Sequence, residues 1–383
     1  MRILILHCSY QYKGGEDTVV EEEMKLLISA GHQVKLLLFS NSGNELLKAL
    51  QLPFNFSSYL TTKKIIKAYK PDIVHIHNLH FAASPSVMYA IARCKIPFVI
   101  TLHNYRLLCP SGTLFFGGKI FQDSLKQNFP WSAIKKGVYK NSKIFTFWLS
   151  LSTKLHQWLG TWKLCNKYIV LSDFSRQLVL QSNLHLSPVQ IVIKPNFGAS
   201  YTISNVSVNN HFLYVGRLTE EKGILLLLNT FSALGYEIRI AGDGPLKNKV
   251  IEFSEKFSNI KFLGSLEKQD VLEQLRSCTA LIFPSVWFEG MPLIIIEAFS
   301  TGTPVIASKL GAMESMIIHG YNGFHFAPGD QEDFSTQLTK WTKCSYEQKK
   351  SLRRNSLKSY REHYSPKSNV RQLEAIYNSV LLK

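Results

Sequence analysis

Two cations bracketed by glycines mark a stretch of the sequence where chemistry could occur. Residues 216–223 read GRLTEEKG and directly follow the apolar run Phe212–Val215. Arg217 offers a planar bidentate fork and Lys222 a compact point charge, and both suit the oxygens of a diphosphate. Considered alone, however, such a stretch is better explained as a charged loop in water.

The strongest local signal is FPSVWFEGMPLIIIEA, residues 283–298. Its apolar second half predicts a buried helix, with Pro292 in the first turn and Gly302 after its end. Burying the carboxylate of Glu297 inside such a helix without a partner would be costly, so a binding partner is expected. If every step between Glu289 and Glu297 were helical, the two would lie about 12 Å apart. That is too far for a glycosidase pair and suits two contacts with one long ligand. Pairing of Glu297 with a buried Arg or Lys is the less favoured alternative.

Two glycine pairs give weaker signals. Gly14 and Gly15 precede a helix expected to begin at Thr18, and a ligand could approach the backbone closely there. The spacing is neither G-x-G-x-x-G nor that of a P-loop, which disfavours dinucleotide binding and kinase-like phosphate binding. Gly242 and Gly244 stand in AGDGP, where small residues would keep a strand exit open.

Four histidines crowd two strand ends in the first half of the chain: His75, His77, His80 and His103. Alternation places His75 and His77 on one strand face, but there is no H-E-x-x-H motif and no nearby acid beyond Asp72. We therefore expect no metal site. His103 ends a central strand in TLHNYRLLCP, where a neutral imidazole could contact a sugar hydroxyl.

Strands and helices in alternation must position these residues. Apolar runs alternate with segments of helical period, such as Thr18–Ala30 and Ser86–Arg93, which predicts two parallel α/β domains. A polar stretch, Ser200–Asn210, is expected to link them. Their sheets would present their carboxyl ends to one shared cleft, where ligands bind in open α/β folds. The predicted strands of the first domain are Arg2–His7, Val34–Phe39, Asp72–His77, Phe98–Leu102, Tyr168–Leu171 and Val189–Lys194. Those of the second are Phe212–Val215, Glu237–Ala241, Ile260–Phe262, Ala280–Phe283, Pro304–Ala307 and Gly323–Phe326.

The composition indicates a folded, basic protein. The 383 residues are too many for one hydrophobic core, and the net charge is +17. Lys119 to Arg176 contains ten basic and two acidic residues, interleaved with four tryptophans. Such a surface suits anionic lipid headgroups, with a solvated face over an aromatic core as a nearly equal alternative. No nucleic-acid-binding pattern accompanies the charge, so no nucleic acid is expected as a partner.

Other features bear on location. The N-terminal MRILILHC reads as a strand and not as a signal peptide, and Ile144–Leu151 is too short to span a bilayer. The six cysteines are scattered without a C-x-x-C pair, which predicts neither a disulfide framework nor a zinc ribbon. A reducing cytoplasm is the expected compartment.

Taken in order, the motifs resemble those of glycosyltransferase family 4. The resemblance rests on GGE, HIHNLH, TLHNYRLLCP, GRLTEEKG, GDGP and FEGMPLIIIEAF. It implies the GT-B fold, with Rossmann-like domains at 1–197 and 198–365 facing a central cleft and a helix at 366–383 crossing back to the first domain. A basic, aromatic insertion covers about 110–165. Relatives often carry a C-E-x-C stretch there; this chain has IFQDSL, which leaves Cys109 alone.

The resemblance also implies roles for named residues. Arg217 and Lys222 would hold the diphosphate of a nucleotide-diphosphate sugar, and Glu297 its ribose hydroxyls. Glu289 and the backbone after it would hold the donor sugar. Gly15 would approach the diphosphate from across the cleft, and His103 would contact the transferred sugar. The expected catalytic residues are His103, Glu289, Arg217 and Lys222. The expected donor-binding residues are Gly14, Gly15, Gly216, Arg217, Lys222, Gly242, Gly244, Glu289, Gly290, Met291, Pro292, Leu293 and Glu297.

The expectation is therefore a hexosyl-type glycosyltransferase that acts with retention and needs no obligatory cofactor or metal. It would move a sugar from UDP- or GDP-sugar to a lipid-linked glycan in surface polysaccharide synthesis, peripherally on the inner face of the membrane. Two alternatives share the architecture: an enzyme acting on a small soluble acceptor, and a sugar-nucleotide epimerase, which would release altered sugar nucleotide without an acceptor.

Overall fold

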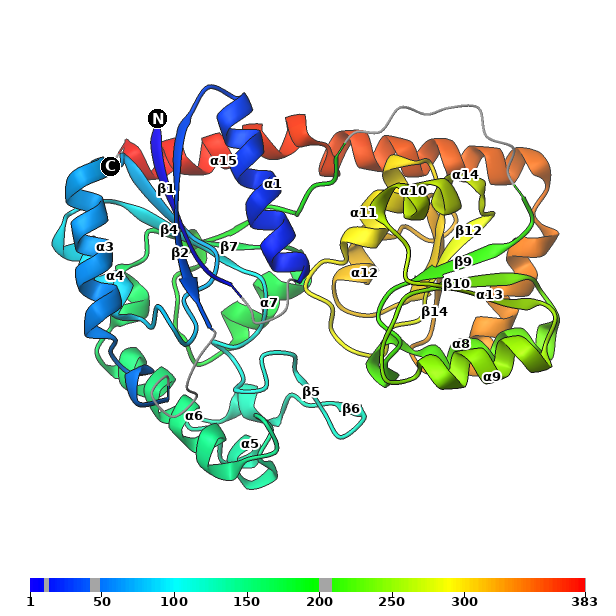
Figure 1. Cartoon of the computed structure of the whole chain (residues 1–383), viewed down its shortest axis with the longest axis horizontal. Helices are drawn as coiled ribbons and strands as arrows, with labels where there is room; N and C mark the ends of the chain where they lie inside the picture. Colours follow the sequence, from blue (N-terminus) through cyan, green and yellow to red (C-terminus); the bar gives the residue numbers. More distant parts are fainter. Residues whose placement is uncertain (10–13, 42–48, 200–208, 383) are drawn as a thin grey trace. The chain divides into compact units, whose positions relative to one another are not determined.

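The chain divides into two compact units, each built around a parallel sheet. The computed structural model describes residues 1–9, 14–41, 49–199 and 209–382. One unit comprises Met1–Phe116, Phe121–Asn196 and Asn369–Lys383, and the other Gly117–Ile120 and Phe197–Ser368. Figure 1 shows both sheets and the helices that cover them.

The first unit contains a six-stranded parallel sheet in the order β2-β1-β3-β4-β7-β8. Both faces of this sheet are buried, which is why its strands read as nearly continuous apolar runs. Leu4 and Leu6 of β1 point into the core beneath α3 and α4. Ile3 and Ile5 pack against α1 and α15 on the other face. The strands are β1 (Arg2–Ser9), β2 (Gln33–Ser40), β3 (Ile73–Ile76), β4 (Phe98–Leu102), β7 (Lys167–Val170) and β8 (Ile191–Ile193). The helices are α1 (Gly15–Ser29), α3 (Phe56–Tyr69), α4 (Ser86–Arg93), α5 (Trp131–Lys136), α6 (Lys143–Trp158), α7 (Asp173–Gln181) and α15 (Pro366–Leu381).

The second unit contains a six-stranded parallel sheet in the order β11-β10-β9-β12-β13-β14. The order reverses between the neighbours β9 and β12, and in such doubly wound sheets ligands bind at the carboxyl ends of the strands beside the reversal. The strands are β9 (Phe212–Val215), β10 (Ile238–Ala241), β11 (Ile260–Gly264), β12 (Ala280–Phe283), β13 (Val305–Ser308) and β14 (Gly323–Phe326). The helices are α8 (Ile224–Leu234), α9 (Lys247–Lys256), α10 (Lys268–Ser277), α11 (Leu293–Ser300), α12 (Ala312–Met316), α13 (Gln331–Lys343) and α14 (Tyr346–Ser359).

The predicted α/β class and the predicted strands are confirmed, with small differences at their ends. The expected helix start at Thr18 is wrong, because α1 begins at Gly15. Asp17 accepts a hydrogen bond from the Gly14 N–H at 2.8 Å, and Gly14 is extended with φ −123°. This helix start therefore depends on an acidic cap and not on the conformational freedom of glycine.

Several features bear on the other expectations. Most of the expected linker, Ser200–Asn210, lies outside the described residues. All six cysteines are free thiols. Among the described helices, none is both long and apolar enough to cross a bilayer. Leu373 and Tyr377 of α15 pack in the core of the first unit.

The insertion contains local elements that the sequence reasoning did not resolve. A short hairpin, β5 (Phe115–Phe116) and β6 (Lys119–Ile120), precedes α5 and α6. Within α6, Thr146, Ser150 and Ser152 are buried beside Leu149, whereas Ile144 is 81% and Trp158 70% exposed. The insertion thus presents an apolar face to the outside.

Candidate active site

In the second unit, the loops that leave β9 and β12 form one backbone assembly at the carboxyl end of the sheet. The Val286 N–H donates to the Glu221 carbonyl at 2.9 Å, and the Ser285 hydroxyl donates to the same carbonyl at 3.2 Å. The strands that precede these loops are neighbours on either side of the order reversal. The loops of the two strongest charged motifs are therefore joined where a ligand is expected.

Glycines permit this assembly by letting backbones approach closely. Gly223 has φ +74°, and a Cβ there would lie 2.0 Å from the Pro284 carbonyl oxygen. Gly242 has φ +148°, and its Cβ would lie 1.9 Å from the Gly216 carbonyl oxygen. The expectation that the glycines of AGDGP keep an entrance open is wrong in its reason: they let the exit of β10 pack against the exit of β9.

Lys222 and Glu289 meet across the two loops. The Lys222 Nζ donates to Glu289 Oε1 at 2.6 Å, and both side chains are largely buried. The same oxygen accepts hydrogen bonds from Ser285 Oγ at 2.8 Å and Trp287 Nε1 at 2.6 Å. The ammonium also lies 5.4 Å from the centre of the Trp287 ring. Lys222 is thus held in place by a carboxylate and by the face of an aromatic ring.

Arg217 is placed differently from Lys222. Its side chain is 64% exposed, and its guanidinium lies 3.4 Å from Glu221, four residues further along the same loop. The loop itself is fixed, because the Tyr214 hydroxyl donates to the Arg217 carbonyl at 2.8 Å. The structure therefore joins Lys222 and Glu289 directly and leaves the Arg217 head group at the surface.

Glu297 lies in α11, whose burial is confirmed, but the placement of Pro292 in the first turn is wrong. The helix begins at Leu293 with Pro292 as its N-cap in an extended conformation, so Glu289 and Glu297 do not belong to one helix. Glu297 forms an ion pair with Lys268 at the start of α10. Pairing with a buried Arg or Lys was the less favoured alternative; the structure does pair Glu297 with a lysine, but the Lys268 side chain is 54% exposed.

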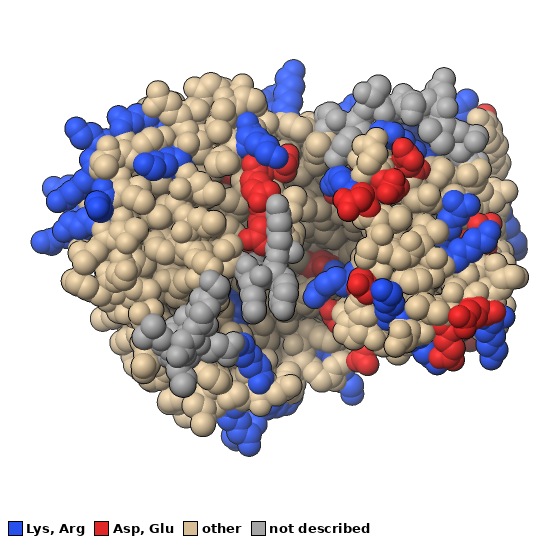
Figure 2. Space-filling model, viewed as in Figure 1, with Lys and Arg blue, Asp and Glu red and all other residues tan. Residues whose placement is uncertain are grey.

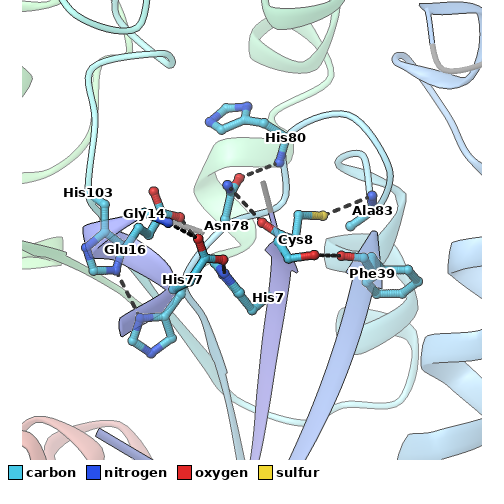
Figure 3. Close-up of polar contacts among 12 residues, drawn as sticks. His7, Cys8, Gly14, Glu16, Phe39, His77, Asn78, His80, Ala83 and His103 are labelled. Carbon is cyan, nitrogen blue, oxygen red and sulfur yellow. Dashed lines mark hydrogen bonds and ion pairs between the residues drawn. The ribbon is translucent and has the colours of Figure 1, made fainter. Parts of the chain in front are cut away.

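In the first unit, the histidines predicted to crowd the strand ends do so around a carboxylate. His75 and His77 share a strand face, as alternation predicts, with ring centroids 4.1 Å apart. Glu23 Oε1 lies 3.2 Å from His75 Nδ1 and 3.1 Å from His77 Nε2. Glu23 comes from α1, so the expectation that Asp72 is the nearest acid is wrong. His103 stacks on His77 and shares a hydrogen bond of 3.0 Å with it (Figure 3).

Lys194 balances the charge of this cluster. Its Nζ lies 2.8 Å from Glu23 Oε2, and both side chains are almost completely buried. Burial alone would raise the pKa of Glu23, but Lys194 and the two histidines outweigh it and hold the pKa well below its usual range. Burial lowers the pKa of His77 to about 4 and that of His103 well below its usual range. The cluster thus holds one buried ion pair beside the neutral imidazoles of His77 and His103.

The same cluster has the composition of a metal site but not its charge balance. Within the described part of the chain, Glu23, His75 and His77 each offer one ligand atom within 4.8 Å of the others. A divalent cation there would meet the ammonium of Lys194, which already occupies the carboxylate. His75 is also engaged on both nitrogens, by the Tyr377 hydroxyl at 2.8 Å and the Thr101 hydroxyl at 2.7 Å.

The start of α1 carries charges of its own. His7 Nε2 lies 2.9 Å from Asp17 Oδ1, and Glu16 stands beside it in the first turn (Figure 3). Asp17 also accepts a hydrogen bond from the Gly14 N–H. The positive N-terminal end of the α1 dipole is therefore stabilised by a carboxylate of the protein itself.

Glu23 and Lys194 were not predicted from the sequence, although the pattern of α1 gives a signal for Glu23. Glu23 falls in the buried stripe of α1 with Val19, Val20 and Leu27, and a carboxylate in such a stripe signals a buried partner. Lys194 gives no comparable local signal, because its partner lies 171 residues away.

Comparison with known proteins supports the family resemblance. The glycosyltransferase family 4 model matches residues 13–197, and the glycosyl transferases group 1 model matches residues 204–359. The chain belongs to glycosyltransferase family 4. It is therefore an enzyme that transfers a sugar.

Two distant relatives match most of the chain. An uncharacterized glycosyltransferase of Methanocaldococcus jannaschii is 24% identical over 88% of this chain and 87% of its own. The UDP-Gal:alpha-D-GlcNAc-diphosphoundecaprenol alpha-1,3-galactosyltransferase of Escherichia coli is 24% identical over 78% and 73%.

Solved structures establish the fold class. Anabaena HepE in complex with UDP has a TM-score of 0.71 at 16% identity, covering 99% of this chain and 100% of its own. A glycosyltransferase from Rickettsia africae has a TM-score of 0.71 at 19% identity, covering 99% of both chains. The fold is GT-B.

Proposed function

We propose that the protein is a retaining glycosyltransferase that moves a sugar from a UDP- or GDP-sugar to a lipid-linked glycan acceptor in the synthesis of a surface polysaccharide. The observation that carries the donor half is the Lys222–Glu289 pair, which spans the exits of β9 and β12 at 2.6 Å. A UDP-glucose complex of Anabaena HepE, a protein of the same fold, supports a nucleotide-sugar donor.

The paired lysine can act on a diphosphate without moving far. Its ammonium has three donors, so it can bind a phosphate oxygen while it keeps Glu289. Arg217 lies on the same loop with an exposed head group and can add a bidentate contact. As the bond from the sugar to the diphosphate breaks, negative charge grows on the leaving diphosphate, and fixed cations and main-chain N–H groups stabilise that charge. Retention then follows from attack on the face that the leaving group departs from.

The remaining roles follow from position. Glu289 and the main chain of Gly290, Met291 and Leu293 would hold the donor sugar, whereas Pro292 has no N–H to offer. Glu297 would exchange its half-exposed partner Lys268 for the ribose hydroxyls. In the first unit, Gly15 would approach the diphosphate, and the neutral His103 would contact the transferred sugar.

The acceptor half rests on the surface of the insertion. Ile144, Phe147, Leu155 and Trp158 form an exposed apolar stripe along α6, and the Lys154 ammonium lies 5.9 Å from the centre of the Trp158 ring. On the face shown in Figure 2, Lys and Arg side chains lie over α5. An exposed apolar stripe among lysines suits an anionic membrane surface. The Escherichia coli relative, whose name specifies a diphosphoundecaprenol acceptor, supports the same reading.

The test of transfer uses the purified full chain with UDP- and GDP-sugars and a polyprenyl-diphosphate-linked glycan. We expect one sugar to be added with its anomeric configuration retained, as measured by mass spectrometry and NMR of the product. Altered sugar nucleotide without acceptor would identify an epimerase instead, and equal transfer to free sugars would identify a soluble-acceptor enzyme.

The membrane part has its own test. Sedimentation with vesicles containing phosphatidylglycerol should retain the protein at low salt, and vesicles of phosphatidylcholine alone should not. The triple change Lys135→Glu, Lys136→Glu and Lys140→Glu should abolish binding. The same charge reversal on α9, at Lys247, Lys249 and Lys256, is the matched control and should leave binding intact. No binding of the wild type to anionic vesicles would refute this part.

A further inference from the structure

A buried line of polar groups in the first unit leads to His103. It begins at Lys194 after β8, continues through Glu23 in α1 and His77 after β3, and ends at His103 after β4. Successive atoms are 2.8, 3.1 and 3.0 Å apart. Lys194, Glu23 and His77 are each at most 3% exposed, whereas His103 is half-buried.

The chemistry of each group fixes where the protons lie. Lys194 is a donor only and bonds one oxygen of Glu23. Glu23 is ionised, and its other oxygen lies 3.1 Å from His77 Nε2. The pair does not have the geometry of a full hydrogen bond. A lone pair on Nε2 would nevertheless repel the carboxylate at this distance, so Nε2 must carry a hydrogen. Because burial keeps His77 neutral, its Nδ1 then has a lone pair and no hydrogen. His103 Nε2 must therefore donate to His77 Nδ1, and this leaves His103 Nδ1 as an acceptor.

We infer that Glu23 and His77 are positioning residues that hold His103 as its Nε2–H tautomer, with Nδ1 available to accept a hydrogen bond from a hydroxyl of the transferred sugar. This rests on the proposed function, in which His103 contacts that sugar. Within the described residues, no protein group is bonded to His103 Nδ1. Stacking of the His103 and His77 rings, at 18° between planes, adds a fixed orientation to the fixed tautomer.

The line also explains why an ion pair is buried behind the histidines. A carboxylate in this position without a cation would be too costly, and a neutral amide would not hold the hydrogen of His77 on Nε2. Lys194 is itself held by Asn369 Oδ1 at 3.2 Å, and Asn369 donates to the Pro195 carbonyl at 2.9 Å. The pair is thus supported from α15 and from the chain after β8.

Glu23→Gln is the most informative variant because it should reverse the direction of the hydrogen bonds from residue 23 through His77 to His103. Lys194 can only donate, so the glutamine must turn its oxygen to Lys194 and its NH2 group to the histidines. That NH2 group would donate to His77 Nε2 and move the hydrogen of His77 to Nδ1. His77 would then donate to His103 Nε2, and His103 would carry its hydrogen on Nδ1, where the wild type has an acceptor.

The experiment is two-bond 1H–15N NMR of the full chain labelled on histidine nitrogens, with His103 assigned by His103→Gln. We expect an unprotonated Nδ1 in the wild type and a protonated Nδ1 in Glu23→Gln. With a donor and acceptor pair that the wild type turns over, kcat should fall about tenfold or more in Glu23→Gln. The dissociation constant of UDP should stay within about twofold, since the diphosphate is held in the other unit. Glu22→Gln, an exposed position on the same helix, is the matched control and should change nothing.

Two further variants keep the inference testable if Glu23→Gln does not fold, which a thermal melt would show. His77→Asn retains an acceptor oxygen for His103 and should keep most of kcat, whereas His77→Leu should lose it. A wild-type His103 with its hydrogen on Nδ1, or equal losses in His77→Asn and His77→Leu, would overturn the inference. The NMR result does not require turnover, so absence of any transferase activity would count against the proposed function alone.

Discussion

The two units place their reactive groups at the same location in their sheets but treat charge in opposite ways. In the second unit, Lys222 and Glu289 meet between the exits of neighbouring strands and are 15% and 9% exposed. In the first unit, the ion pair of Lys194 and Glu23 is 2% and 1% exposed and lies behind the histidines. What the first unit presents at its strand exits is the neutral His103.

This difference indicates a division of labour. The ammonium of Lys222 and the carboxylate of Glu289 remain partly exposed and meet at one carboxylate oxygen. Such a pair can form additional hydrogen bonds with a charged ligand. Charges that are fully buried cannot do so and instead fix the geometry and protonation of what lies in front of them. Under the proposed function, the second unit would bind the diphosphate, and the first would rigidly support a neutral contact with the sugar.

The largest effect should come from breaking the buried pair. Lys194→Met should destabilise the protein by about 3–5 kcal/mol, because it leaves the Glu23 carboxylate buried without its cation. The double variant Lys194→Met/Glu23→Gln should recover much of this loss. The measurement is urea denaturation of the three variants and the wild type.

The pH dependence of that loss has a definite sign. In the wild type the folded-state pKa of Glu23 is held below its unfolded value, so its contribution is present at neutral pH and is lost as the pH falls through the folded pKa. In Lys194→Met, burial should raise that pKa instead, and folding should take up a proton. The stability gap between the two proteins should therefore narrow from pH 7 to pH 5, and a constant gap would contradict the assignment.

A smaller effect is expected at the loop junction of the second unit. Gly223→Ala should cost about 3 kcal/mol, because alanine must adopt φ +74° and its Cβ meets the Pro284 carbonyl. Gly235→Ala, at φ +70° with nothing within 4 Å of the new Cβ, is the matched control and should cost about 1 kcal/mol. Thermal melts compare the two, and equal costs would show that close packing of the loops is unimportant.

A change at Glu297 should affect binding more than stability. Glu297→Ala should weaken UDP about tenfold if the carboxylate exchanges Lys268 for the ribose hydroxyls. A 2′,3′-dideoxy nucleotide should bind the variant and the wild type equally, since it lacks the hydroxyls. Glu314→Ala, at an exposed pair with Lys309, is the control. Unequal binding of the dideoxy nucleotide would mean that Glu297 acts elsewhere.

The sequence predicted the elements better than the contacts. Buried parallel strands are visible as apolar runs, and motifs at their ends located Lys222, Glu289 and His103 correctly at strand exits. The start of α1 was missed because it depends on a single hydrogen bond to Asp17. Pro292 was expected in the first turn of α11 but precedes that turn as an extended N-cap. The partnership of Glu23 and Lys194 joins positions 171 residues apart, and only the fold brings them together.

The measurement that tests the division of labour most directly is calorimetric titration of UDP and GDP into the wild type, Lys222→Ala and His103→Ala. Lys222→Ala should weaken the bound nucleotide by about tenfold to a hundredfold, since it removes a charge-assisted bond to the diphosphate. His103→Ala should leave nucleotide affinity within about threefold and lower only the rate of transfer. Equal losses of affinity in the two variants, or none in Lys222→Ala, would contradict the account.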